Sequence, residues 1–207
     1  MYNIKNQNKN DAPGRILPEA EVKSDEELVA LTLVNQDYFL YIINRYKDKL
    51  FRYIRRITNI DADEAEDVLQ DVFIKAYLNL NDFDQDLKFS SWIYRIAHNQ
   101  VITQYRKTKA RPQGHKVDLT NEEVKNLISD LNPTRDIDIK LLKGNIHKVL
   151  DKLEEKYREI LILKFIEEKS YQEISDIIER PIGTVASLLN KAKQEFRKEF
   201  TRQNIKV

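Results

Sequence analysis

Glycine and proline are scarce in this sequence, and their scarcity limits the folds that it can adopt. Four Gly and five Pro occur among 207 residues, which is about 4% of the chain, against about 12% in average proteins. Neither residue occurs from Glu19 to Arg111 or from Asn145 to Arg180. Because strands joined by tight turns depend on these residues, we predict an all-α fold.

Apolar side chains at helical spacing predict four helices in the first half of the chain. Ser24 and Glu27 form a capping-box pattern at the start of the first helix, and Ser90 is the expected N-cap of the fourth. The expected helices follow Ser24, contain the apolar stripe from Phe39 to Ile57, run from about 61 to 80, and run from Trp92 to about Lys107.

The composition changes after residue 110. Residues 111–135 hold Pro112, Gly114 and Pro133 and show little apolar periodicity, so we expect an interdomain linker there. The last part of the sequence predicts a short helix that follows Ser170, a turn, and a longer basic helix. This order is typical of a helix-turn-helix. The expected segments are a mobile tail (1–23), an N-terminal helical domain (24–110), a flexible linker (111–135) and a C-terminal helix-turn-helix domain (136–207).

Charge is distributed in blocks of alternating sign. The chain has 35 Lys and Arg against 34 Asp and Glu, but residues 59–86 carry nine acids and one base, and residues 92–116 carry six bases and no acid. Residues 117–138 are again acidic, and residues 180–206 are basic. Such blocks predict partners of both signs, with solvated helix faces as the alternative.

Cysteine is absent, which excludes disulfide frameworks, zinc ribbons, iron–sulfur sites and thiol catalysis. The first twenty residues contain no apolar block of signal-peptide length, and no stretch approaches the roughly 18 apolar residues of a membrane span. We therefore expect a cytoplasmic protein.

Motifs for metal binding or catalysis are also missing. The acids at 82–86 imitate the start of a calcium loop, but Leu87 stands where the loop needs Gly, and Ile93 stands where it needs Glu. His98, His115 and His147 lack metal-ligand spacing and are expected at the surface. Phosphate-binding glycine loops and nucleophile motifs do not occur. We predict no enzyme, no metal and no cofactor.

The helix after Ser90 places polar side chains on one face. At 100° per residue, the members of this stripe share an arc of about 80°. Arginine donates to phosphate or guanine, asparagine pairs with adenine edges, and tryptophan offers a stacking face, so we expect nucleic-acid binding, with an ordinary solvated face as the alternative. The stripe consists of Trp92, Arg95, Asn99, Thr103 and Arg106.

Two further helices carry candidate surfaces. In the last helix, an apolar side that includes Val185, Leu189 and Phe196 must face the core, and the opposite side would enter a major groove, unless the motif is purely structural. Its candidate DNA contacts are Thr184, Ala186, Ser187, Asn190, Lys191 and Gln194. In the acidic helix, Asp67, Gln70, Asp71 and Ile74 form a stripe that suits a basic protein partner; acids in a first turn that stabilise the helix dipole are the alternative.

Three blocks, at 61–77, 89–107 and 170–198, resemble in that order the motifs of bacterial extracytoplasmic-function sigma factors. The resemblance covers roughly residues 35–107 and 136–200. It implies an all-α protein of two small domains that binds core RNA polymerase and directs it to promoters. In this family a sequestering anti-sigma factor is a common partner.

The resemblance also implies roles for individual residues. Asp67, Gln70, Asp71 and Tyr77 would dock on the polymerase clamp, and the acidic linker would thread the RNA path of the polymerase. The loop from Phe83 to Phe89 would hold an unstacked base. Arg95, Asn99 and Thr103 would meet the minus-ten element, and the last helix would read the minus-thirty-five element.

This sequence departs from the family pattern in its DNA-contact positions. Thr103 stands where some members have Asn, and Ala186 and Leu188 stand where basic residues are common, so we expect a weaker or different upstream element. Two other functions stay open at this point. They are a stand-alone helix-turn-helix regulator with a helical sensor domain, and an α-helical adaptor that binds only proteins.

Overall fold

The computed structural model describes residues 22–84, 86–107, 119–131 and 139–203, and these residues form helices and connecting turns without any strand. The all-α prediction is therefore confirmed. Most of the expected tail at 1–23 lies outside the described residues. The N-terminal unit contains α2 (Asp25–Val34), α3 (Phe39–Thr58), α4 (Ala62–Leu78) and α5 (Phe89–Lys107), with 3-10 turns at Gln36–Tyr38 and Leu80–Asp82.

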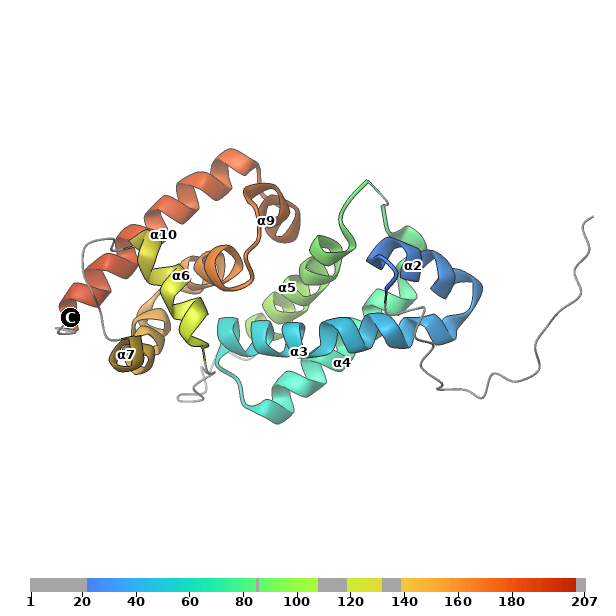
Figure 1. The fold of residues 1–207 in the computed structure, drawn as a ribbon, viewed down its shortest axis with the longest axis horizontal. Coiled ribbons are helices and arrows are strands. Elements are labelled where there is room, and N and C mark those ends of the chain that lie inside the picture. Colours follow the sequence, from blue (N-terminus) through green and yellow to red (C-terminus); the bar gives the residue numbers. More distant parts are fainter. Residues whose placement is uncertain (1–21, 85, 108–118, 132–138, 204–207) are drawn as a thin grey trace, which may run out of the picture.

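The C-terminal unit comprises the described residues from 119 onward. It contains α6 (Asn121–Leu131), α7 (Ile139–Lys152), α8 (Glu155–Leu161), a π-helical turn (Ile162–Ile166), α9 (Tyr171–Ile178) and α10 (Ile182–Arg202). Helices α9 and α10 pack on each other through buried Ile174, Ile177, Val185 and Leu189, which confirms the helix-turn-helix. Figure 1 shows the two units side by side, with α5 next to the C-terminal unit.

Local sequence explains where several helices begin and end. The Ser24 hydroxyl accepts from the Glu27 amide, and the Glu27 carboxylate accepts from the Ser24 amide, which makes the predicted capping box. Asp61 caps α4 in a similar way through the Glu64 amide. Helix α3 ends at Asn59, whose φ of 62° is left-handed, a conformation that asparagine tolerates.

The start of α5 differs from the prediction. Ser90 is not the N-cap, because the helix begins at Phe89. The Phe89 side chain is fully buried, and its backbone amide donates to the Glu26 carboxylate of α2 at 3.3 Å. A carboxylate from another helix thus accepts the hydrogen bond of an amide that a local N-cap would otherwise satisfy.

The expected linker contains a packed helix. Helix α6 lies within 111–135, packs against α7 and the π-helical turn, and buries Val124 and Leu127 completely. Thr120 and Glu123 form a capping box at its start, with amide-to-side-chain distances of 2.7 and 3.2 Å. The segment expected as a linker with little apolar periodicity therefore holds a helix at Asn121–Leu131.

A core substitution in α6 tests this packing. We expect Leu127→Ala to lower the free energy of unfolding of the C-terminal unit by about 2–5 kcal/mol, because it leaves a cavity among buried side chains. Urea denaturation followed by circular dichroism measures the change. Lys125→Ala, at an exposed position of the same helix, is the control, and equal stability of the two variants would show that α6 does not pack.

Candidate functional site

The polar stripe on α5 forms largely as predicted. Arg95 is partly buried, while Asn99 and Thr103 are exposed on the same side of the helix. The Thr103 hydroxyl donates to the backbone carbonyl of Asn99 at 2.7 Å, so its oxygen is still able to accept. The side chain of Arg106 lies outside the described residues. Helix α5 carries no acidic residue, so its own charges do not repel a nucleic acid.

The aromatic residues assigned to the same surface lie elsewhere. Phe83, Phe89 and Trp92 pack against one another with ring centroids 5.4–5.5 Å apart, and Trp92 is only 5% exposed. The prediction of an accessible stacking face on Trp92 was therefore wrong for this conformation. These rings join the core because they close the space between α2, α3 and α5, where Phe89 also meets Tyr46.

The C-terminal unit covers part of the stripe. Glu179, which follows α9, has a left-handed φ of 52° and directs its carboxylate at α5. It accepts from the Asn99 amide nitrogen at 3.4 Å and lies 4.0 Å from an Arg95 guanidinium nitrogen. In this conformation a carboxylate therefore occupies the place where the stripe would meet a phosphate or a base.

Two carboxylates of the C-terminal unit reach further into the N-terminal unit. Glu159 accepts from the Tyr53 hydroxyl at 2.7 Å and lies 2.6 Å from His98 Nδ1. Glu167 accepts from the Tyr94 hydroxyl at 2.6 Å and from Arg56 at 3.2 Å. We call these contacts, together with those of Glu179, the interdomain contacts.

Burial shifts the pKa values of Tyr53, Tyr94 and Glu167. It raises the pKa values of Tyr53 and Tyr94, and the adjacent carboxylates of Glu159 and Glu167 raise them further. Both phenols therefore stay protonated at neutral pH and donate to the carboxylates. Burial also raises the pKa of Glu167, although Tyr94 and Arg56 oppose the shift.

His98 was expected at the surface but is buried, with 8% of its area exposed. Its partner Glu159 comes from the other unit, and neither the spacing of the histidines nor the sequence around His98 indicates such a partner. His147 is half-buried on α7, and His115 lies outside the described residues.

The acidic face of α4 is exposed. Asp67 and Gln70 face solvent, Asp71 accepts from the Gln100 amide at 2.7 Å, and the Tyr77 hydroxyl donates to Gln36 at 3.3 Å. The same face continues into two exposed apolar side chains, of which the predicted stripe included the first. These are Ile74 and Leu78, which are 57% and 70% exposed.

The side of α10 that was predicted to face away from the core is largely exposed. Leu188, in contrast, lines a cavity of about 460 Å³ between α5 and the C-terminal unit. The predicted DNA contacts Thr184, Ser187, Asn190, Lys191 and Gln194 are exposed, and Ala186 is half-buried. Among the described residues, no helix is both long and apolar enough to cross a membrane.

Comparison with known proteins gives a consistent family. Sigma-70 region 2 matches residues 42–111, and Sigma-70, region 4 matches residues 143–196. The ECF RNA polymerase sigma factor SigW of Bacillus subtilis is 35% identical over 172 residues, which cover 80% of this chain and 90% of SigW. The ECF RNA polymerase sigma-E factor of Escherichia coli is 29% identical over 77% of this chain and 85% of its own length.

Two solved structures share the fold. CnrH, solved in complex with the cytosolic domain of CnrY, has a TM-score of 0.62 at 23% identity and matches 85% of this chain and 96% of its own. The sigma factor RpoE of Bartonella quintana, solved with the anti-sigma factor NepR, has a TM-score of 0.56 at 20% identity, covering 79% of this chain and 96% of its own. This chain therefore belongs to the extracytoplasmic-function group of sigma-70 RNA polymerase sigma factors, as the similarity to SigW, the order of the matched regions and the helix-turn-helix show.

Proposed function

We propose that the N-terminal unit of this sigma factor binds core RNA polymerase and the minus-ten element, and that the C-terminal unit reads the minus-thirty-five element. The acid-free polar stripe on α5 carries this proposal. Arg95 supplies a forked donor, and the exposed Asn99 and Thr103 supply groups that can read base edges. The chain would act by binding alone, without chemistry of its own.

The exposed face of α4 is the proposed docking surface for the polymerase clamp. The N-terminal half of this face carries Asp67 and Gln70, and the C-terminal half carries Ile74, Tyr77 and Leu78. Acids attract a basic partner over a distance, while exposed apolar side chains add contact area once the partner has docked. The mixed character of this surface fits a protein partner better than DNA.

Helix α10 is the proposed reader of the upstream element. Ser187, Asn190, Lys191 and Gln194 project from its exposed side, where they can reach base edges and phosphates. Ala186 is half-buried and has no polar group, so fewer contacts form than in relatives with a basic residue there. We propose an upstream element that is weaker or differs in sequence.

The interdomain contacts imply that the two units separate when the protein works. Glu179 covers Arg95 and Asn99, and duplex DNA cannot reach this part of the stripe while α9 lies against α5. Core polymerase would pull the units apart by binding each of them. The isolated chain should accordingly bind promoter DNA poorly.

The proposal extends to cellular context. The relative from Bartonella quintana was solved with an anti-sigma factor, and we propose that this chain also has such a sequestering partner. We further propose that it acts in the cytoplasm, where RNA polymerase and the chromosome are found.

Single-round transcription tests the function. Core polymerase with this chain should initiate at a defined start on genomic DNA fragments, whereas core alone or the chain alone should not. Failure of promoter-dependent initiation with a correctly folded chain would contradict the proposal. A gel shift in which the chain alone binds a palindromic site tightly would instead identify a stand-alone regulator.

A further inference from the structure

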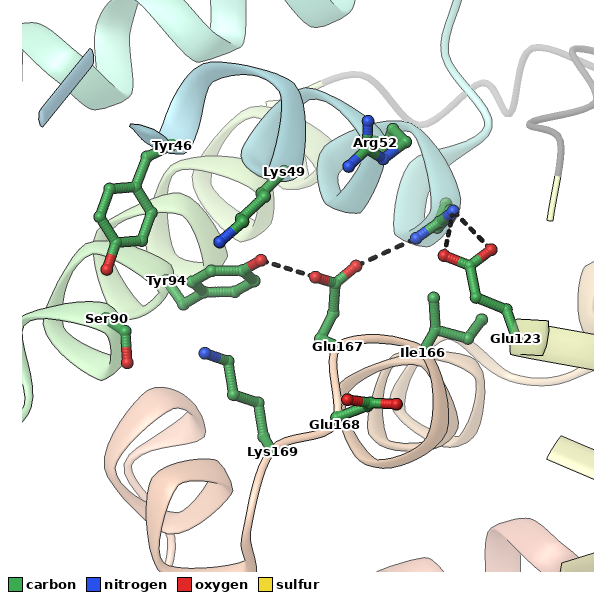
Figure 2. A pocket seen from close by; sticks show the side chains of 11 residues that line it. Tyr46, Lys49, Arg52, Ser90, Tyr94, Glu123, Ile166, Glu167, Glu168 and Lys169 are labelled. Atoms are coloured by element: carbon green, nitrogen blue, oxygen red, sulfur yellow. Dashed lines mark hydrogen bonds and ion pairs between the residues drawn. The ribbon is translucent and has the colours of Figure 1, made fainter. Parts of the chain in front are cut away.

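A polar cavity of about 250 Å³ lies where the two units meet, away from the DNA stripe. Figure 2 shows that its walls come from both units: α3 and α5 on one side, and the π-helical turn with the residues after it on the other. The lining residues that matter here are Lys49, Ser90, Tyr94, Glu167 and Lys169. Lys49, Ser90 and Lys169 have no role in the function proposed above.

Three carboxylates line this cavity, and two of them are engaged with one guanidinium group. Arg56 donates to Glu123 at 3.0 Å and to Glu167 at 3.2 Å, and Glu167 also accepts from Tyr94. The carboxylates of Glu123 and Glu167 therefore lie at one end of the cavity, directed at Arg56, and that of Glu168 accepts from an amide nitrogen of α6 at 3.1 Å. Their oxygens satisfy donors that belong to the protein itself.

The ammonium groups at the other end have no comparable partner. Lys169 Nζ lies 4.4 Å from the centroid of the Tyr94 ring, and Lys49 Nζ lies 5.8 Å from that of Tyr46. Among the described residues, neither ammonium group forms an ion pair or a hydrogen bond to a carboxylate. Figure 2 shows Lys49 and Lys169 on opposite sides of the Tyr94 ring, with Ser90 beside them.

The ammonium of Lys169 is in an unfavourable place for a lone cation. Burial is the largest effect and lowers its pKa. Glu173 and Glu167 raise the pKa, and repulsion from Lys49 and Lys88, a smaller effect, lowers it. An anion bound beside the Lys169 ammonium would offset its repulsion from Lys49.

The backbone that delivers Lys169 is unusual as well. A π-helical turn at Ile162–Ile166 is followed by Glu168, whose φ of 53° is left-handed. Such turns and such non-glycine residues are rare and occur often at functional sites. Here they direct Glu167 to Arg56 and Lys169 into the cavity.

We propose that this cavity binds the phosphate or diphosphate group of a small molecule, with Lys49 and Lys169 as its charged contacts and Ser90 as a hydroxyl donor. Its volume is below the about 300–1,000 Å³ of pockets for drug-sized ligands, which suits a compact anion and excludes a duplex. Because the contacts come from both units, the bound anion holds the units together. That regulatory consequence rests on the proposed function, whereas the binding itself does not.

Calorimetric titration of the full chain tests the binding, with inorganic phosphate, pyrophosphate and a nucleoside diphosphate as separate probes. Ionic strength is held constant with sodium chloride. We expect one or more of these anions to bind, and Lys49→Ala and Lys169→Ala each to weaken binding about tenfold or more, since each removes a charge-assisted hydrogen bond. Lys47→Ala, at a lysine of α3 that does not line the cavity, should bind as the parent does. No binding of any probe, or equal binding by all variants, would overturn the site.

Fluorescence energy transfer tests the coupling to closure. The absence of native cysteine allows one dye on each unit through Asp48→Cys and Lys198→Cys. The anion that binds should raise the transfer efficiency and lower the affinity of the labelled chain for core polymerase. Unchanged transfer would overturn the claim that the anion holds the units together. Raised transfer without an effect on core association would contradict the proposed function and leave the site intact.

Discussion

Replacing Arg95 and Asn99 together with alanine should lower promoter-dependent initiation by about 30-fold or more, because each contact to a base edge contributes about 1–3 kcal/mol. Core binding should not change, since both side chains lie on α5, away from the exposed face of α4. Single-round transcription measures the first quantity, and co-purification of the chain with core polymerase measures the second.

The matched control changes Glu179, the residue that contacts Arg95 and Asn99 from the C-terminal unit. Glu179→Gln removes the charge that faces Arg95 and Asn99, keeps the side-chain shape, and leaves the stripe intact. It should therefore preserve or raise initiation. Because the double variant also loses the contact with Glu179, it opens the chain as readily as the control does, so its loss of activity reports missing DNA contacts. Normal initiation by the double variant would contradict the role of the stripe.

Introducing two lysines on the exposed face of α4, as Asp67→Lys with Gln70→Lys, should weaken binding to core polymerase by at least about tenfold, since like charges at an interface cost several kcal/mol. Asp71 is left unchanged because its carboxylate holds Gln100. Fluorescence anisotropy of a labelled chain titrated with core polymerase measures the affinity.

Asp48→Lys is the control for this charge reversal. Asp48 is exposed on α3, so the substitution adds positive charge without altering α4. Its core affinity should match that of the parent chain, and all variants should show the same helical circular dichroism. Equal affinity of the Asp67/Gln70 variant and the control would place the polymerase contact elsewhere.

The helices followed from local sequence to a large extent. Apolar spacing and the capping patterns at Ser24 and Ser170 indicated α2 to α5 and the helix-turn-helix within a few residues. Helix α6 was not predicted, because Pro112, Gly114 and Pro133 dominate the composition of the sequence around it. The signal that could have found it was the capping box of Thr120 and Glu123, followed by buried residues at helical spacing.

The site was only partly predictable from the sequence. A helical wheel shows which residues share a face, but it does not say what covers that face. Glu159 meets Tyr53 from 106 positions away along the chain, and neither local propensity nor charge balance indicates such a pair. Trp92 illustrates the same limit, because its burial depends on the positions of Phe83 and Phe89.

The capping carboxylates of the C-terminal unit have two roles at once. Glu123 accepts from the Thr120 amide and binds Arg56, while Glu173 accepts from the Ser170 amide and binds Lys88. The first turns of α6 and α9 are therefore tied to the N-terminal unit by the same side chains that start them. By thermodynamic reciprocity, separation of the units loosens these turns. On the proposed opening of the chain, the helix-turn-helix would thus gain local freedom to adjust to a DNA groove.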